Sequence, residues 1–153
     1  MAQNQGKKWE EKFKESWIES FPKTTIFRLA DQQSYYKGGS SNPCDFIALP
    51  NNYLYLIELK SHKGNTFPFE KFRQYDLLLS YKNNYNTKCC LIIWFIDHNK
   101  VLYIPIEEIE KMKLDNKKSV NIKMLQTQEY NIIDVPCEIK RIYPKCNWNI
   151  INE

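Results

Sequence analysis

The sequence lacks the features of a membrane or secreted protein. No apolar run approaches the roughly 20 residues that a membrane-spanning helix requires. The longest run, Cys89–Ile96, has the length of a buried strand. The opening segment MAQNQGKKWEEKFKES has no apolar stretch behind its charges, so it does not resemble a secretory signal. We therefore expect a cytoplasmic protein with no membrane association.

The cysteines lack the spacing of a metal-binding or redox motif. None of the five forms a CxxC pair, and an odd number cannot close completely into disulfides. Cys89 and Cys90 are adjacent at the start of an apolar segment, so their side chains would point to opposite faces of a strand. We predict five reduced cysteines that serve as small hydrophobic residues, and no structural zinc site.

The chain also lacks a strong net charge. Its formal charge of +4 permits nucleic-acid binding without arguing for it. The length of 153 residues, with 42% hydrophobic and 26% charged residues, is typical of one globular domain. No internal repeat, low-complexity tract or long linker divides it, so residues 1–153 are predicted to form a single domain. Any activity on DNA has to be inferred from motifs.

The hydrophobic pattern predicts an α/β domain with a mixed central sheet flanked by helices. Pro50-Asn51-Asn52 is a tight-turn sequence, so the strands on either side of it are expected to pair as an antiparallel hairpin. The last forty or so residues alternate weakly and suggest one or two edge strands. The predicted helices are 7–21, 69–82 and 105–113, the predicted strands are 24–29, 44–49, 53–60, 89–96 and 101–104, and 30–42 is a predicted loop.

One cluster of charged residues lies within these apolar strands. Asp45 is followed, after twelve intervening residues, by Glu58-Leu59-Lys60. The predicted hairpin brings these groups to similar heights on neighbouring strands, and Glu58 and Lys60 project from one face. Two acids and a lysine among core residues are costly unless they are paired or bind a cation.

This arrangement suits phosphodiester hydrolysis. Two carboxylates can bind Mg²⁺, which polarises a phosphoryl oxygen and activates a bound water. A nearby lysine can position that water and offset the charge that develops in the transition state. From spacing alone, a salt-bridged pair of strands explains Asp45, Glu58 and Lys60 equally well.

Two helices offer further candidates for the same site. Glu10 points into the apolar arc of the first helix, where either a metal site or the helix dipole and partial solvation could accommodate its charge. Treated as one helix, residues 69–82 place Asp76 on the apolar side and Gln74 nearly opposite. Asp76 is therefore predicted to be the better placed to reach the sheet.

Beyond these local patterns, the sequence resembles the RecU family of Holliday-junction resolvases, especially its shorter members from phages and mobile elements of low-GC Gram-positive bacteria. The resemblance covers roughly residues 6–80, about half the chain. It rests on NPCDFIA (42–48), LYLIELKSHKG (54–64) and FPFEKFRQYD (67–76), supported by GKKWEEKFKES (6–16) and FRLAD (27–31).

The resemblance implies a restriction-endonuclease-like fold, a homodimer, dependence on Mg²⁺ or Mn²⁺, and paired nicks in a four-way junction. It identifies Asp45 and Glu58 with metal-binding acids and Lys60 with a catalytic lysine. The family usually carries a glutamine on the following helix, and the resemblance places Asp76 there, with Gln74 two positions earlier. The stalk of longer members has no room here except in 30–42, which leaves selectivity for junctions open.

Four residues are candidate DNA contacts. The loop after Glu58-Leu59-Lys60 carries His62 and Lys63, which could contact backbone phosphates. Arg28 and Lys37 are two further cations. Surface solubility explains most such charges, and a lone His62 is a poor general base.

The sequence thus favours a metal-dependent Holliday-junction resolvase that cleaves the P–O3′ bond and leaves 5′-phosphates. The host would be a bacterial or phage-infected cell. Alternatives are a duplex-cutting endonuclease of the same PD-(D/E)xK class, a catalytically weak junction-binding protein, or a domain whose acids are merely paired. Residues 110–153 could build a dimer interface or part of the DNA path.

Overall fold

The computed structural model describes residues 2–29 and 42–152, so most of the predicted loop 30–42 lies outside the described residues. The elements are α1 (Ala2–Ser20), β1 (Ile26–Arg28), β2 (Phe46–Ala48), β3 (Leu54–His62), β4 (Thr66–Pro68), η1 (Phe69–Lys71), α2 (Tyr75–Ser80), β5 (Thr87–Phe95), η2 (Ile96–His98), β6 (Lys100–Pro105), α3 (Ile106–Leu114), β7 (Ser119–Asn121), α4 (Met124–Thr127), β8 (Ile133–Val135), β9 (Cys137–Lys140), β10 (Tyr143–Cys146) and η3 (Trp148–Asn152).

A six-stranded sheet in the order β1-β2-β3-β5-β6-β8 organises these elements. β3 and β5 are long parallel neighbours, in register from Leu54 opposite Thr87 to His62 opposite Phe95. The other pairings in this sheet are antiparallel. Asn51 and Asn52 have φ values of 51° and 67° in the turn between β2 and β3, where asparagine tolerates the left-handed conformation. The predicted hairpin is therefore confirmed.

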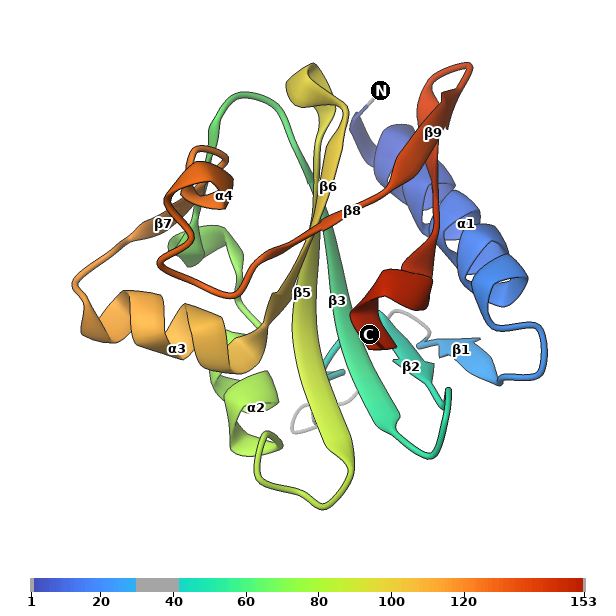
Figure 1. The fold of residues 1–153 in the computed structure, drawn as a ribbon, viewed down its shortest axis with the longest axis horizontal. Helices are drawn as coiled ribbons and strands as arrows, with labels where there is room; N and C mark the ends of the chain where they lie inside the picture. Colours follow the sequence, from blue (N-terminus) through green and yellow to red (C-terminus); the bar gives the residue numbers. More distant parts are fainter. Residues whose placement is uncertain (1, 30–41, 153) are drawn as a thin grey trace, which may run out of the picture.

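The two faces of the sheet are covered by different helices (Figure 1). α1 and η3 pack on the face that carries Tyr55, Ile57 and Leu59 of β3. α2 and α3 pack on the opposite face, with Leu56. Because side chains alternate along a strand, Glu58 and Lys60 project from the Leu56 face, toward the layer of α2 and α3. The mixed sheet flanked by helices agrees with the predicted fold class.

The predicted helix over 69–82 is broken into two pieces. η1 ends where Phe72 leaves the helical region, with φ −98° and ψ 76°, and α2 begins at Tyr75. The N–H of Phe69 donates to the carbonyl oxygen of Lys118 (3.0 Å), so the segment is tied to the β7 side of the molecule before α2 starts. Helical phase is therefore not continuous across the segment, and the predicted orientations of its side chains have to be corrected.

The C-terminal segment forms a second small sheet, the β9–β10 hairpin, followed by η3. Cys137 and Cys146 face each other in its register, with Cα atoms 4.1 Å apart, and form a disulfide. The prediction of five reduced cysteines is thus wrong for this pair, because weak alternation in the sequence did not reveal the hairpin that joins them. Cys44, Cys89 and Cys90 are free and buried. Within the described residues, no helix is long and apolar enough to cross a membrane.

Candidate active site

The centre of the candidate site is a buried glutamate in the middle of β3. Glu58 is 1% exposed, and its Oε2 atom has no hydrogen-bond partner among the described residues. Burial, reinforced by the neighbouring charge of Asp45, raises the pKa of Glu58 to about 8. An acid in this position is costly to fold in its ionised form, and its free oxygen can accept a cation.

Asp45, the residue before β2, lies beside Glu58. The N–H of Asp45 donates to the carbonyl oxygen of Ile57 (3.0 Å), and its Oδ2 accepts a hydrogen bond from the N–H of Leu59 (2.8 Å). Burial raises the pKa of Asp45 above the ordinary value, and the charges of Asp45 and Glu58 are close enough to interact. The β2–β3 register therefore brings the two predicted metal-binding acids into contact.

Two basic side chains lie beside this acid pair. The ammonium nitrogen of Lys60 is 3.2 Å from Oε1 of Glu58, and both Lys60 and Arg28 lower the pKa of Asp45 electrostatically. Arg28 also forms an ion pair with Glu10 of α1, at 2.5 Å. The sequence left open whether a metal site or the helix dipole with partial solvation accommodates the charge of Glu10. In the structure its partner is the guanidinium group of Arg28.

The burial of Gln74 and Asp76 is the reverse of what a single helix over residues 69–82 predicted. Asp76 is exposed, whereas Gln74, at the residue before α2, is half-buried and its Oε1 atom has no partner among the described residues. α2 covers the face of the sheet from which Glu58 projects. The prediction failed because η1 and α2 are separate helices. The direction of a side chain in α2 therefore does not follow from helical spacing counted from Phe69.

The predicted DNA contacts have different surroundings. His62 is half-buried, and its ring makes edge contacts with Phe67 and Phe95 at centroid distances of 5.6 and 6.1 Å. Lys63 is exposed at the start of the following turn. Lys37 lies outside the described residues. Of the described members of this group, Arg28 and Lys63 are exposed, and Arg28 is paired with Glu10.

Two residues that the sequence did not single out hold the turn after β3. Asp97 accepts a hydrogen bond from the N–H of Gly64 (2.8 Å), and the His98 ring contacts the side-chain oxygen of Asn65 (2.5 Å). Gly64 has a φ of +92°, a conformation that favours glycine. The contacts arise because β3 and β5 are parallel and end together. No short-range pattern signals them.

The donor set fits a hard divalent cation in part. Asp45, Glu58 and Gln74 provide oxygen atoms, of which Glu58 Oε2 and Gln74 Oε1 are buried without partners in the described structure. Among residues 2–29 and 42–152, no group of three or more histidine, cysteine, aspartate or glutamate side chains forms a metal cluster. Glu10 and Asp76 therefore do not join Asp45 and Glu58 in one carboxylate cluster. The arrangement is a buried glutamate beside a half-buried aspartate, on the face of the sheet that α2 covers.

Comparisons with known proteins agree with this architecture. One solved structure similar to this chain is Hjc, a Holliday junction resolvase from the archaeal hyperthermophile Archaeoglobus fulgidus. The two chains share 14% identity with a TM-score of 0.57, over 80% of this chain and 93% of Hjc. At this identity the similarity establishes the fold, which confirms the predicted restriction-endonuclease-like architecture. No curated protein sequence matches the chain significantly.

A match in sequence establishes the family. A family model described as Recombination protein U matches residues 24–142. This range contains the acid pair, Lys60 and the segment around Gln74, and it extends well beyond the part of the chain on which the resemblance was first seen. The chain therefore belongs to the Recombination protein U family, RecU.

Proposed function

We propose that this protein is a Holliday-junction resolvase, a metal-dependent endodeoxyribonuclease that makes paired, symmetric nicks in four-way DNA junctions. Membership in the RecU family and a fold shared with a resolvase support the substrate class. The observation that carries the catalytic part is Glu58, buried with an unpartnered oxygen beside a second acid and a lysine.

Asp45, Glu58 and Gln74 would hold the metal, Mg²⁺ or Mn²⁺. When bound, such an ion polarises the scissile phosphate and makes hydroxide available near neutral pH. Asp45 is held in place for this role by the N–H of Leu59, and its contact with Glu58 keeps two oxygen donors together. We prefer Gln74 to Asp76 as the third donor because only Gln74 has a buried oxygen without a partner in the described structure.

Lys60 is the proposed catalytic lysine. Its ammonium group lies at 3.2 Å from Glu58, so it is held beside the acid pair while its side chain is still 27% exposed. From this position it can orient the attacking water and offset the negative charge that develops on the phosphate in the transition state. The P–O3′ bond is the one that breaks, and the product carries a 5′-phosphate.

A homodimer would supply the two active sites that symmetric incision of a junction requires. Two-fold dimers are the commonest oligomers, and a two-fold axis would match the approximate symmetry of four DNA arms. Lys63, exposed just after β3, is the proposed phosphate contact. Activity on chromosomal or phage DNA would place the protein in the bacterial cytoplasm.

A catalytically weak junction-binding protein is the second candidate. It is favoured by the small number of carboxylates at the site, since only Asp45 and Glu58 lie together among the described residues. The two candidates predict the same binding and differ in cleavage.

The decisive experiment compares a labelled four-way junction with a linear duplex of matched sequence, with and without Mg²⁺. Wild type is tested beside Glu58→Ala, and Glu129→Gln, an exposed glutamate, serves as the matched control. Paired symmetric nicks on the junction alone, lost only in Glu58→Ala, are the expected result. Equal cutting of both DNAs would indicate a general endonuclease of the same fold. Binding without cutting would overturn the catalytic proposal.

A further inference from the structure

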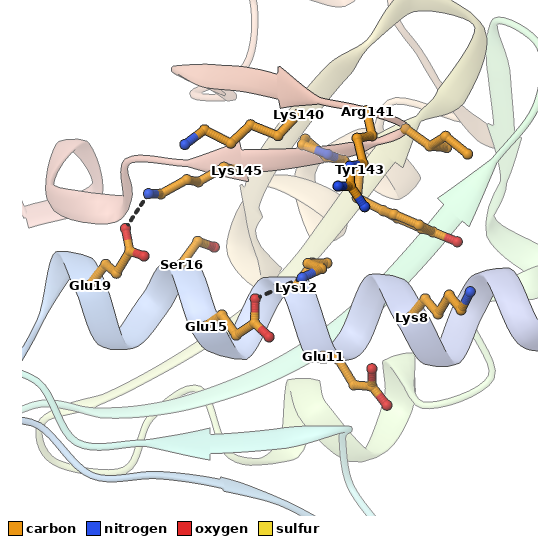
Figure 2. Close-up of a pocket in the computed structure, with 12 residues that line it drawn as sticks. Lys8, Glu11, Lys12, Glu15, Ser16, Glu19, Lys140, Arg141, Tyr143 and Lys145 are labelled. Atoms are coloured by element: carbon orange, nitrogen blue, oxygen red, sulfur yellow. Dashed lines mark hydrogen bonds and ion pairs between the residues drawn. The ribbon is translucent and has the colours of Figure 1, made fainter.

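A groove of about 620 Å³ runs between α1 and the β9–β10 hairpin (Figure 2). It lies on the face of the sheet that α1 covers, opposite to the face of Glu58 and Lys60. Five basic and three acidic side chains line it. Nothing in the proposed hydrolysis uses them, although the hairpin includes the last residues that match the RecU family model.

The acidic side chains of the groove are largely neutralised or turned away. Glu19 pairs with Lys145 at 2.6 Å, and Glu15 pairs with Lys12 at 3.0 Å. Figure 2 shows Glu11 on the side of α1 that points away from the hairpin. Across the described residues, the remaining three cations of the groove have no acidic partner, and they are Lys8, Lys140 and Arg141.

The backbone at the hairpin tip is unusual for an arginine. Arg141 and Ile142 form the two-residue turn between the paired residues Lys140 and Tyr143, and Arg141 has a φ of +63°. Glycine is the residue that best tolerates this conformation in a two-residue hairpin turn. An arginine in this conformation at an exposed tip suggests a functional role for its side chain, because glycine would adopt the turn with less strain.

The hairpin is anchored firmly at its base. Trp148, which follows it, donates from its indole N–H to Ser16 and from its backbone N–H to Ser20, both at 2.9 Å. The Cys137–Cys146 disulfide closes the open end of the hairpin, and Lys145 reaches Glu19 on α1. The cations at the tip are therefore held on a fixed support, which lowers the entropy that a bound ligand would have to remove.

The tip also lies at the same end of the molecule as other features of the DNA-cutting machinery. In Figure 1 the turn between β9 and β10, the start of α1 and the end of β3 all lie at the upper end of the view. Lys63, the proposed phosphate contact, follows the end of β3. A DNA arm that crosses this end of the molecule could contact both regions.

We propose that Lys8, Lys140 and Arg141 form a basic rim that binds backbone phosphates of a DNA arm outside the active site. The inference rests on the proposed function, since it takes DNA as the ligand. Lysine and arginine contacts to phosphates provide affinity without reading sequence, and each contact releases counterions. The rim therefore holds the arm, while the acid pair performs the hydrolysis.

The test measures binding of a labelled four-way junction in EDTA, by fluorescence anisotropy, over a series of salt concentrations. The variants are Arg141→Gly and the double variant Lys140→Gln/Arg141→Gly, with Lys23→Gln as the control at an exposed lysine near the other end of α1. Glycine suits the backbone at position 141, so thermal unfolding should occur at the same temperature or higher. A loss of binding would then not reflect a damaged fold.

In the double variant the slope of log K against log salt should fall by about 2, since each phosphate contact contributes about 0.9. Affinity at low salt should fall roughly tenfold or more, and Lys23→Gln should match wild type. At saturating protein with Mg²⁺, the single-turnover cleavage rate should stay within about twofold of wild type, because the rim does not touch the reacting atoms.

If the slope of log K against log salt is unchanged in the double variant, the proposal that the basic rim binds DNA phosphates is wrong. A wild-type protein that binds the junction but does not cut it would overturn the catalytic proposal and leave the rim standing. A wild-type protein that binds neither junction nor duplex would overturn both. The binding slope and the cleavage assay therefore separate the two ideas.

Discussion

The acid pair, Asp45 just before β2 and Glu58 on β3, and the basic rim on α1 and the β9–β10 hairpin both depend on charge, but their charges lie in opposite environments. Glu58 is 1% exposed, and its ionised form is opposed by burial and by Asp45. Lys140 and Arg141 are exposed on a turn, where water and salt screen them. Burying charge makes each group at the acid pair individually decisive, whereas the rim can act only through the number and position of its cations.

Buried and exposed charges also differ in their effect on the stability of the fold. An unpaired carboxylate in a sheet destabilises the fold unless a cation or a proton neutralises it. An exposed lysine or arginine costs the fold little, and single ion pairs at the surface contribute little to stability. We therefore expect substitutions at the acid pair to change activity and stability in opposite directions, and substitutions at the rim to change only DNA binding.

The largest expected effect is at Glu58. Glu58→Gln keeps the shape of the side chain but removes its negative charge, so cleavage of the junction should fall by about 1,000-fold or more, as loss of several kcal/mol of transition-state stabilisation implies. The thermal midpoint of the metal-free protein at pH 8 should rise. Single-turnover cleavage and calorimetry measure the two effects. A variant that cuts normally would remove Glu58 from the catalytic site.

The second effect is the pH dependence of stability in the metal-free protein. The pKa of Glu58 is about 8 in the folded state, against an ordinary value of 4.5 for a glutamate in the unfolded chain. Between these values the unfolded chain ionises while the folded chain keeps its proton, so stability is full at low pH and falls as pH rises to about 8. The difference is at most about 5 kcal/mol, because each pKa unit corresponds to about 1.4 kcal/mol. Asp45, whose pKa is also raised, changes stability in the same direction.

Urea unfolding of wild type and Glu58→Gln at a series of pH values isolates this contribution. The difference between the two proteins should grow from pH 5 to pH 8 and then level off. Mn²⁺ or Mg²⁺ should stabilise wild type more at pH 8 than at pH 6, because a cation competes with protons for the same oxygens. Curves that stay parallel across this range would show that Glu58 ionises normally.

How much of the acid pair could be predicted from the sequence depends on the range of the interactions. The shared face of Glu58 and Lys60 follows from strand alternation, and the contact with Asp45 follows from the Asn51-Asn52 turn. The position of Gln74 depends on where η1 stops and α2 starts, in a segment whose first residue, Phe69, is hydrogen-bonded to the distant Lys118. Local patterns do not contain this information.

The hairpin was harder to predict for the same reason. β9 and β10 are short, Cys137 and Cys146 reveal their pairing only in three dimensions, and the anchoring hydrogen bonds from Trp148 reach α1, more than 120 residues earlier in the chain. The sequence around Arg141 contains neither the glycine nor the asparagine that usually marks a two-residue turn. A basic residue in a left-handed turn is visible only once the backbone is known.

A third prediction distinguishes Gln74 from Asp76. Gln74→Leu removes a buried oxygen near the face of Glu58, so junction cleavage at limiting Mn²⁺ should fall about tenfold or more and recover partly at high Mn²⁺. Asp76→Asn, at an exposed position, should stay within about twofold of wild type. Titration of cleavage rate against Mn²⁺ measures both. The opposite ranking would restore Asp76 as the metal-site residue that the sequence alone favours.

The smallest expected effect is at the disulfide that closes the hairpin, on the face of the sheet opposite to the acid pair. In Cys137→Ser/Cys146→Ser the cations of the rim remain, but their support is less rigid, so junction affinity should fall by about threefold, the scale of ordering one or two side chains on binding. The salt slope should not change, because the number of phosphate contacts stays the same. Titration of unfolded wild type without reductant should find the three free cysteines of the structure. If it finds five thiols instead, the hairpin is held by Trp148 and Lys145 alone, and the double serine variant should then bind the junction as wild type does.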